Sequence, residues 1–510
     1  MLFAFSLVAA ACGGGSDDAA GETETTEGDG TTGGAIDLDE LEDETETTEA
    51  EVEGPEPTNM EELEAAWAAD RQKVIDRITE EGLGLGADGI VTGPGGFTMD
   101  TTVCPANWSD TQGLTDDTIL YGHTTAQSGN LAAYGNIAAG MQSYFKYINE
   151  NGGIGGRNVE LIVKDDGYVA TQTIELVDQL LQSDKPFMIT TLGSPNTFAV
   201  YDTLNEKCVP HPFVMTGHPA WGDPEKHPWT WGDQMSYSTE AILWGTWIKT
   251  NMADRLPVKV TGLVMENDFG LSYEGGMKVF ADANPDVISE FVAVRHEAAA
   301  PTVTNEMTTI AAGKPDVFIA MTAGNPCLLA VQEAARAGLT GGDTELFMPS
   351  VCKDPNAYMI PAGDAAEGWN IVGGGLKTTT DPQYVDEVFI AFMNDRFEAD
   401  GLDISVGLYG TGFGLFAWPA VEALRIAAEL EGGLTRTNFV IAARAFQGSH
   451  PLALDGIEFG MNGNEDAFPI EGSDFAVYDA AAKSWIQVGG VIDLNGSSGL
   501  CAWNKDKNSC

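Results

Sequence analysis

Residues 121–166 read YGHTTAQSGNLAAYGNIAAGMQSYFKYINENGGIGGRNVELIVKDD, and this stretch decides the fold. After a polar loop, apolar residues recur at three- and four-residue steps, which lays one apolar stripe along a helix. The helix stops at residues 151–153, Asn-Gly-Gly, because glycine adopts a positive φ at little cost. Residues 159–163, VELIV, form a short apolar run that is typical of a strand buried in a parallel sheet. The stretch therefore predicts one strand–helix–strand unit.

The loop at 125–130 follows a strand and precedes a helix, which is where open α/β sheets bind small ligands. The glycines of NGGIGG, residues 151–156, have the opposite context, since they follow a helix and precede a strand. A nucleotide-binding glycine loop needs the reverse order. We therefore interpret residues 151–156 as a helix stop.

Strand and helix patterns alternate along the rest of the chain, which predicts parallel, doubly wound sheets. One sheet with so many strands would be unusual, so we expect two Rossmann-like lobes. The predicted helices cover 171–184, 197–207, 236–252, 272–283, 304–313, 327–338, 382–400 and 407–430. The predicted strands cover 186–192, 212–217, 260–267, 290–297, 316–324, 345–351 and a final pair in 475–489.

The composition bounds the function. With 510 residues the chain is too long for one ordinary hydrophobic core. It has 77 acidic and 25 basic residues, a net charge of −52. This charge argues against nucleic acid as a partner and against electrostatic adhesion to anionic membranes. We interpret it as a strongly solvated surface.

The first eleven residues, MLFAFSLVAAA, are apolar, too short to span a bilayer, and end in small residues before Cys12. They resemble the lipobox of bacterial lipoproteins. This resemblance implies a signal peptide at 1–11 and a lipid anchor on Cys12 at the outer face of the cell membrane. Residues 12–58 are acidic and rich in Gly and Thr, so we expect a disordered linker.

Residues 59–115 are expected to form a helix and an extension before the first lobe. Asn59 and Glu62 fit a capping box for a helix that runs to about Glu81. Its apolar stripe predicts docking on the main body, and a partner-binding helix is the alternative.

Without Cys12, six cysteines remain, and an even number fits disulfides in an oxidising compartment. Six cysteines allow fifteen pairings, and the spacing alone does not select one. The pairing that we prefer is Cys104–Cys208, Cys327–Cys352 and Cys501–Cys510. No cysteines or histidines show zinc spacing, so we expect no metal and no cofactor.

SGNLAAYG at 128–135 and YINENGGIGGRNVELIVKDDG at 147–167 resemble the type I periplasmic solute-binding proteins of the branched-chain amino-acid class. The resemblance covers roughly 116–490. It implies two lobes joined by a three-segment hinge, with crossings near 233–237, 370–375 and 469–473. The implied parts are 116–233 with 374–469 for the first lobe, 234–373 with 470–495 for the second, and 496–510 for a tail.

The same resemblance implies the ligand site. Members of the family hold their ligand with loops that follow strands, and the loop at 192–197 also opens a helix whose free N–H groups suit a carboxylate. ENDFG at 266–270 matches a family motif that places Phe269 over the ligand. The matching positions are Ser128, Tyr134, Ser194, Met215, Thr216 and Gly217 in the first lobe, and Phe269 and Val351 in the second. Thr197 flanks a helix start and Gly324 and Asn325 follow a strand end, so we expect them at the same cleft.

Two positions depart from the pattern of amino-acid binders. Gly217 stands where the family has a threonine, and Val351 stands where an acidic residue pairs with the ligand ammonium. A buried ammonium without a carboxylate partner would be costly. The sequence therefore leaves the class of ligand undecided between an amide, an organic or aromatic acid, and an amino acid that is anchored differently.

Residues 218–237 are rich in aromatic side chains, namely Trp221, Trp229, Trp231 and Tyr237. We interpret them as packing beside the first crossing, and lining of the pocket is the alternative. Histidines 211, 218 and 227 have no metal-binding spacing and are interpreted as loop or turn residues.

Together, these features predict an extracytoplasmic solute-binding protein of an ABC importer. We expect a monomer that closes two lobes on a small ligand and is recognised by a membrane permease. One alternative is a ligand sensor that signals to a membrane receptor. The other is an enzyme using the same cleft, for which the chain lacks G-x-S-x-G, H-E-x-x-H and P-loop motifs.

Overall fold

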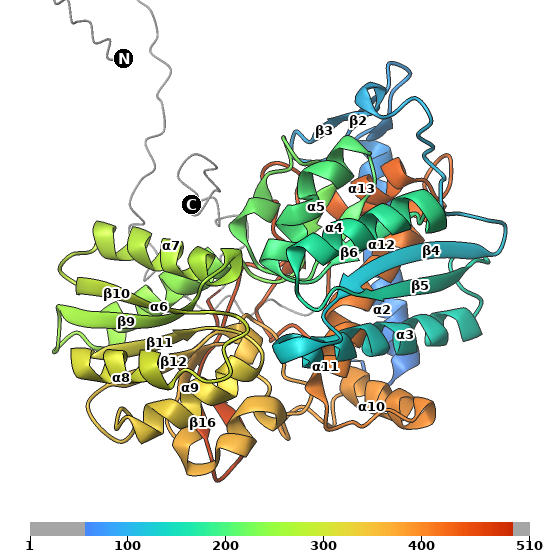
Figure 1. Cartoon of the computed structure of the whole chain (residues 1–510). Coiled ribbons are helices and arrows are strands. Elements are labelled where there is room, and N and C mark those ends of the chain that lie inside the picture. Colours follow the sequence, from blue (N-terminus) through green and yellow to red (C-terminus); the bar gives the residue numbers. More distant parts are fainter. Residues whose placement is uncertain (1–56, 493–510) are drawn as a thin grey trace, which may run out of the picture. The chain divides into compact units, whose positions relative to one another are not determined.

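The computed structural model describes residues 57–492 (Figure 1). The predicted signal peptide at 1–11, the predicted lipidation site Cys12, nearly all of the predicted linker and the predicted Cys501–Cys510 pair lie outside the described residues. No helix between residues 57 and 492 combines the length and the apolar character that a membrane span requires.

The first sheet is parallel and has the order β5-β4-β6, continued by the parallel pair β7-β8. The amide of Met215 donates to the carbonyl of Thr191, and the amide of Ile189 donates to that of Pro210, so β6 and β7 are joined. The strands are β4 (Thr118–Thr125), β5 (Asn158–Asp165), β6 (Met188–Thr191), β7 (His211–Val214) and β8 (Thr230–Gly232).

Helices from two distant parts of the chain accompany this first sheet, and together they form the first lobe. The early ones are η2 (Gly129–Tyr134), α3 (Gly135–Glu150), α4 (Ala170–Gln179), η3 (Leu180–Asp184) and α5 (Ser194–Glu206). The late ones are α10 (Val388–Asp400), α11 (Gly407–Gly410), η8 (Thr411–Ala417), α12 (Trp418–Glu429) and α13 (Arg436–Arg444).

The second sheet has seven strands in the order β10-β9-β11-β12-β13-β16-β17, of which the first five are parallel. The last two strands pair antiparallel. The strands are β9 (Val258–Met265), β10 (Ile288–His296), β11 (Val317–Met321), β12 (Glu345–Met348), β13 (Asn370–Val372), β16 (Phe475–Asp479) and β17 (Ser484–Gln487).

In this second lobe, α7 lies on one face of β9, β10 and β11, and α8 and α9 lie on the other (Figure 1). The helices are α6 (Tyr237–Asn251), α7 (Asp268–Ala283), α8 (Thr304–Gly313), α9 (Asn325–Arg336), η5 (Ser350–Cys352), η6 (Pro355–Met359) and η7 (Ile360–Ala366). Two lobes of alternating strands and helices confirm the predicted α/β fold. The residue numbers of the lobe boundaries stay predictions.

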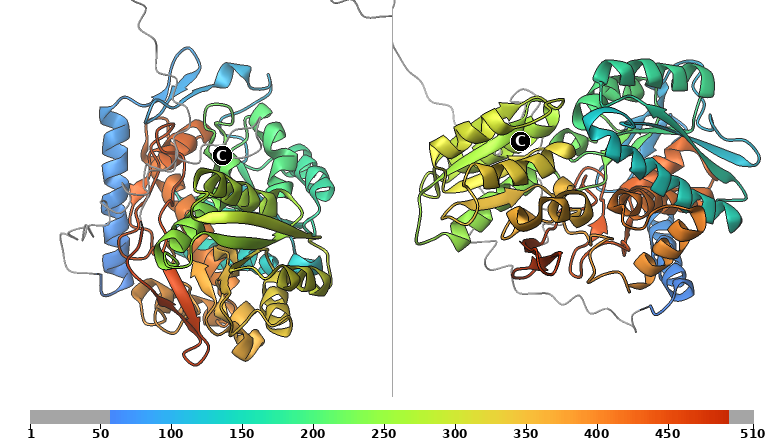
Figure 2. Two further views of the ribbon diagram at one scale, coloured as in Figure 1. Left: turned by 90° about the vertical axis from the view of Figure 1, so that its left-hand side faces the viewer. Right: turned by 60° about the horizontal axis from the view of Figure 1, so that its bottom comes forward.

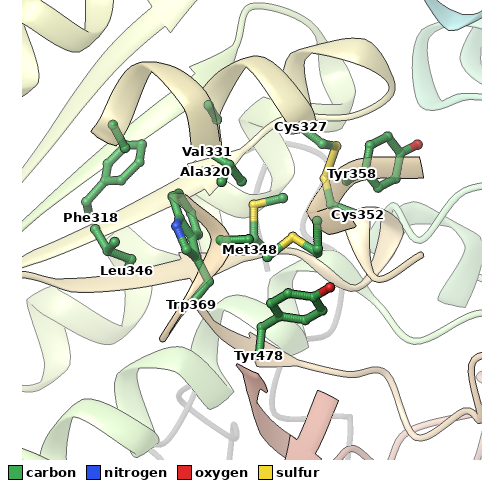
Figure 3. Packing of buried hydrophobic residues seen from close by; sticks show 14 of the residues in the cluster. Phe318, Ala320, Cys327, Val331, Leu346, Met348, Cys352, Tyr358, Trp369 and Tyr478 are labelled. Atoms are coloured by element: carbon green, nitrogen blue, oxygen red, sulfur yellow. A yellow bond between two sulfur atoms is a disulfide. The ribbon is translucent and has the colours of Figure 1, made fainter. Parts of the chain in front are cut away.

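The core of the second lobe fixes the start of α9 to the segment after β12 (Figure 3). Phe318, Leu346 and Trp369 are buried there with Met348. Beside them, the Cys327–Cys352 disulfide joins the first turn of α9 to η5. The second predicted disulfide, Cys104–Cys208, is also present, with 5.7 Å between the Cα atoms.

The N-terminal helix α2 (Met60–Glu80) docks on the first lobe and runs beside α12 (Figure 2). Its predicted cap is present in part, because the Asn59 side chain accepts from the Glu62 amide. The Glu62 carboxylate bonds to the amide of Thr58 instead of that of Asn59, so the capping box is shifted by one residue. The apolar stripe is covered, which argues against the partner-binding alternative.

Other local features differ from the predictions or were not predicted. A helix was predicted over 382–400, but residues 382–386 form turns, and the helix α10 begins only at Val388. The segment between the loop at 125–130 and α3 is the 3-10 helix η2. The glycine-rich stretch after α2 contains a small antiparallel sheet of β1 (Gly84–Leu85), β2 (Ile90–Thr92) and β3 (Thr98–Asp100), which the sequence did not indicate. A further short pair joins β14 (Gln447–Gly448) to β15 (Phe459–Gly460).

Trp67 anchors α2. Its side chain is 1% exposed, its ring packs edge-on against Trp418 and Phe389, and its Nε1–H donates to the carbonyl of Ser449. Beside it, Arg71 and Arg425 both pair with the buried carboxylate of Glu422. An ion pair of this kind adds little by itself, so the ring supplies the main contact.

Trp67→Ala is expected to lower the free energy of unfolding by about 3 kcal/mol or more, because it leaves a large cavity. Urea unfolding followed by circular dichroism measures the change. The control is Glu61→Ala on the exposed side of the same helix, which should stay within about 0.5 kcal/mol of the unaltered protein. Equal stabilities for both variants would mean that α2 is not part of the cooperative fold.

Candidate functional site

A cavity of about 170 Å³ is lined by residues of both lobes. A cavity of about 150 Å³ with apolar walls is enough to bind benzene. From the first lobe and the chain that returns to it, the wall includes Leu131, Tyr134, Ile137, Tyr168, Leu192, Gly193, Met215, Thr216, Leu376, Lys377, Thr378, Thr379, Gly407, Leu408, Thr411, Leu415, Phe416 and Leu452. From the first crossing and the second lobe it includes Gln234, Met235, Tyr237, Phe269, Ala323, Ser350, Val351, Lys353, Asp354, Tyr358, Gly373 and Gly374.

The first-lobe wall is built from the carboxyl ends of adjacent parallel strands. Tyr134 follows β4, Tyr168 follows β5, Gly193 follows β6 and Thr216 follows β7. Because parallel strands end at the same edge of their sheet, these short connections converge. The site therefore lies where the topology of an open α/β sheet places ligands.

Gly193 has to be glycine. Its φ is +94°, and a Cβ at this position would lie 2.2 Å from the ring of Tyr168. Tyr168 itself has a φ of +62°, a conformation that is uncommon for a non-glycine residue. The backbone is thus arranged to place the Tyr168 ring against the wall at Gly193.

A chain of hydroxyl groups runs from α5 to Tyr237. The Ser194 and Thr216 hydroxyl oxygens are 2.6 Å apart, and Thr216 donates to the Tyr237 oxygen over 3.4 Å. The Gln234 Nε2–H also donates to that oxygen, over 3.1 Å. Burial raises the pKa of Tyr237, so its phenol keeps its proton. The cavity thus has a neutral phenol whose oxygen already accepts two hydrogen bonds.

Two contacts cross from η2 to the second lobe. The amide of Gly324 donates to the Tyr134 hydroxyl oxygen over 3.1 Å. The Asn130 side chain donates to the carbonyls of Ala298 and Ala300 over 3.3 and 3.2 Å. Burial raises the pKa of Tyr134 as well. These contacts place Tyr134 between the two walls of the cavity.

The second-lobe wall includes Phe269, which lies at the start of α7. Its ring is 3% exposed and packs edge-on against Tyr237, with 4.9 Å between the ring centroids. Tyr273, one turn further along α7, stacks on Tyr237 from behind. Val351 lies in the same wall on η5, which the Cys327–Cys352 disulfide holds in place.

Glu240 lies directly behind the wall and fixes Ser350. Its two carboxylate oxygens accept from the Ser350 amide (2.7 Å) and the Ser350 hydroxyl (2.8 Å), and Tyr273 donates a third hydrogen bond (2.8 Å). Burial raises the pKa of Glu240 to about 7, although the hydrogen bonds from Ser350 and Tyr273 and the charge of Lys353 favour ionisation. Glu240 is therefore poised to change charge near neutral pH.

The lysines of the wall already have protein partners. The Lys353 Nζ donates to the carbonyls of Gly373 and Leu376 and pairs with Asp474 at 3.3 Å. Lys377 pairs with Glu387 at 2.7 Å. Each cation therefore adds positive potential to the cavity without being fully available for a ligand.

Eight of the sequence-predicted ligand residues lie in the wall or in contact with it. Tyr134, Met215, Thr216, Phe269 and Val351 line the cavity. Ser194, Gly217 and Gly324 support it through hydrogen bonds to Thr216, to the Tyr237 amide and to Tyr134. Their role in ligand binding stays a prediction.

Three predicted residues do not line the cavity. Ser128 is the exposed N-cap of η2, and Asn325 is exposed at the first position of α9. Thr197 is buried but bonds to the Thr191 hydroxyl at 2.8 Å, inside the first lobe. None of these three side chains is part of the cavity lining.

The aromatic residues of 218–237 divide between the two interpretations. Trp221 packs on Phe198 and Tyr201, Trp229 on Trp108, and Trp231 on Phe213 and Phe439, whereas Tyr237 lines the cavity. Of the three histidines, His218 and His227 lie in turns as predicted. His211 does not, because it is buried in β7, where its Nε2 bonds to the Thr191 hydroxyl. Between residues 57 and 492, no group of three or more His, Cys, Asp and Glu side chains is placed to hold a metal ion.

Sequence reasoning missed several wall residues. Tyr168 follows a predicted strand, so the rule that found Tyr134 could have found it. Leu408, Leu415 and Phe416 come from α11 and η8, far along the chain, and no motif marks them.

Two α/β lobes that share a cavity at their strand ends define the class of two-lobed solute-binding proteins. A family described as periplasmic binding protein matches residues 118–460, and the chain belongs to this family. The resemblance to type I periplasmic solute-binding proteins is thereby confirmed. No curated protein sequence matches the chain.

Solved structures share the fold at low identity. A fatty acid ABC transporter substrate-binding protein from Thermomonospora curvata superposes with a TM-score of 0.63 and 20% identity, covering 79% of this chain and 96% of its own. A branched-chain amino acid ABC transporter protein from Thermus thermophilus with bound valine gives 0.64 and 16%, covering 76% and 99%. A solute-binding protein from R. palustris in complex with benzoate gives 0.59 and 19%, covering 73% and 96%.

Glu240→Gln should change how stability depends on pH. Folding raises the pKa of the Glu240 carboxyl from 4.5 to about 7, so its protonated form adds most to the free energy of unfolding below pH 4.5. This contribution is lost as the pH rises to about 7. Urea unfolding between pH 4 and 8 should show the unaltered protein losing roughly 2–4 kcal/mol relative to the variant across this range. The exposed Glu61→Gln is the control and should follow the unaltered protein. If the free energy of unfolding depended on pH in the same way in Glu240→Gln and in the unaltered protein, the raised pKa of Glu240 would be contradicted.

Proposed function

We propose that the protein is the solute-binding component of an ABC importer and captures one small ligand in the cavity between its lobes. The observation that supports this most directly is that one cavity takes wall residues from both lobes, with Tyr134 and Thr216 on one side and Phe269 and Val351 on the other. A ligand that contacts both walls at once favours the closed arrangement over the open one. The closed form is then the state that a membrane permease recognises.

The contacts between the lobes support closure as the working motion. The bonds from Gly324 to Tyr134 and from Asn130 to Ala298 and Ala300 join the two lobes beside the cavity wall. Each is a hydrogen bond that water can replace when the lobes separate, which costs about 1 kcal/mol or less. A ligand with micromolar affinity supplies roughly −8 kcal/mol, which is enough to decide between the two arrangements.

The proteins of similar fold support a small-molecule ligand. One of them is a fatty acid ABC transporter substrate-binding protein, one has bound valine, and one is in complex with benzoate. We propose binding without turnover, and an extracytoplasmic location with the lipid anchor on Cys12. The anchor rests on the sequence alone. A Cys12→Ser variant that stays in the membrane fraction on expression in bacteria would argue against it.

The full chain should gain thermal stability with at least one class of ligand, because binding to the folded state raises Tm. The panel consists of amino acids, amides and small carboxylates, followed by differential scanning fluorimetry and by mass spectrometry for turnover. Small-angle scattering should show a smaller radius of gyration with that ligand.

The double variant Ser194→Ala, Phe269→Ala should lose the shift, since it removes the hydroxyl behind Thr216 and the ring over the cavity. Tyr144→Phe is the control, because Tyr144 is buried in α3 and does not line the cavity. A shift that survives in the double variant would place the site elsewhere, and conversion of the ligand would favour an enzyme.

A further inference from the structure

We infer that the ligand is a small carboxylic acid with an apolar body, and that it carries a neutral hydrogen-bond donor where an amino acid carries its ammonium group. This inference rests on the proposed function, since it names the ligand class of the same cavity. It follows from which hydrogen-bonding groups of the wall are already used by the protein and which are left for a ligand.

Tyr237 offers a proton to the cavity. A phenol can accept two hydrogen bonds and donate one. Thr216 and Gln234 donate to its oxygen, and no described residue between 57 and 492 accepts its proton. The Tyr237 O–H is therefore left for an acceptor on the ligand.

Tyr134 and Tyr358 together offer a second proton. The Tyr134 oxygen accepts from the Gly324 amide at 3.1 Å. Tyr358 is the neighbour and bonding partner of Tyr134 in the same wall, and a bond between two phenols uses one of their two protons, so one proton of this pair is left for the cavity. Two phenols from different parts of the wall thus present donors. A carboxylate has two acceptor oxygens and matches this pair.

Among the described residues, the wall has one carboxylate, Asp354, and it is already engaged by hydrogen bonds within the protein. Its Oδ1 accepts from the Thr380 hydroxyl (3.1 Å) and the Asn356 amide (3.0 Å). Asp474 and Glu387, which lie beside the wall, are already paired with Lys353 and Lys377. An amino acid would therefore bury its ammonium unpaired, which is costly.

Ser350, next to Val351, offers a ligand only a hydrogen-bond acceptor. Its amide and its hydroxyl proton are both committed to Glu240. The oxygen of Ser350 keeps its lone pairs for a donor from the cavity. A ligand hydroxyl satisfies this oxygen and brings no charge, so a hydroxy acid fits the wall better than an amino acid.

A large part of the remaining wall is apolar, which sets the body of the ligand. Leu131, Ile137, Met215, Leu415 and Phe416 line the cavity with Phe269. The volume of about 170 Å³ suits one ring or a branched chain of similar size.

Two matched series test the inference on the full chain by isothermal titration calorimetry. The first consists of phenylalanine, 3-phenyllactate and 3-phenylpropanoate, which share a skeleton and carry an ammonium group, a hydroxyl or a hydrogen at the same carbon. The second consists of leucine, 2-hydroxy-4-methylpentanoate and 4-methylpentanoate. In at least one series the hydroxy acid should bind tightest, and the amino acid at least tenfold more weakly than the hydroxy acid.

Variants of the residues that line the cavity test whether these residues set the order of affinities. Tyr134→Phe and Tyr237→Phe should each weaken binding of the hydroxy acid about tenfold or more, because each removes a bond to a charged group. Ser350→Ala should remove the advantage of the hydroxy acid over the acid that lacks the hydroxyl. Val351→Asp should reverse the order in favour of the amino acid. Tyr144→Phe, outside the cavity, should leave every affinity unchanged.

The results that would contradict the ligand class differ from those that would contradict the proposed binding function. An amino acid that binds as tightly as its hydroxy analogue would overturn the inference and leave the binding function intact. The same holds if a ligand found in the wider panel lacks a carboxylate. If no compound binds and none reduces the radius of gyration, the proposed function itself fails.

Discussion

The parallel hydrogen bonding of β4 to both of its neighbours is the constraint on which the site depends. Thr125 pairs with Asp165 of β5, and Thr124 pairs with Thr191 of β6, so the three strands end at the same level. A slip by one residue would turn every side chain of a strand to the opposite face. The second sheet has the same arrangement, since Val264 pairs with Met321. The two sets of strand ends supply the polar groups of one cavity.

Much of this arrangement could be predicted from the sequence. The helix stripe, the glycine stop and the apolar strand in 121–166 are local signals, and each corresponds to an element of the structure. Residues such as Tyr134, Thr216 and Phe269 follow a strand after a short connection, so their position relative to the sheet edge is almost fixed by the strand itself. The preferred pairings of Cys104 with Cys208 and of Cys327 with Cys352 are also present.

Two kinds of feature could not be predicted. One is where a side chain near a strand end points, and the other is contact between segments that are far apart in the sequence. Ser128, Thr197 and Asn325 lie close to the strand ends in sequence, but Ser128 and Asn325 are exposed and the Thr197 hydroxyl bonds to Thr191, so none of them lines the cavity. Leu408 and Leu415 reach the cavity from α11 and η8 only because the chain returns to the first lobe after building the second. The hydroxyl chain of Ser194, Thr216 and Tyr237 joins three segments whose contact no local pattern encodes.

The way in which α2 is attached has a mechanical consequence. Trp67, the Arg71–Glu422 pair and the Cys104–Cys208 bond all fasten residues 57–115 to the lobe that contains β4. Tension that reaches Thr58 from the preceding chain is therefore borne by this lobe. None of these three attachments involves the lobe that contains β9, so a pull on the N-terminal side does not act directly on the wall that holds Phe269 and Val351.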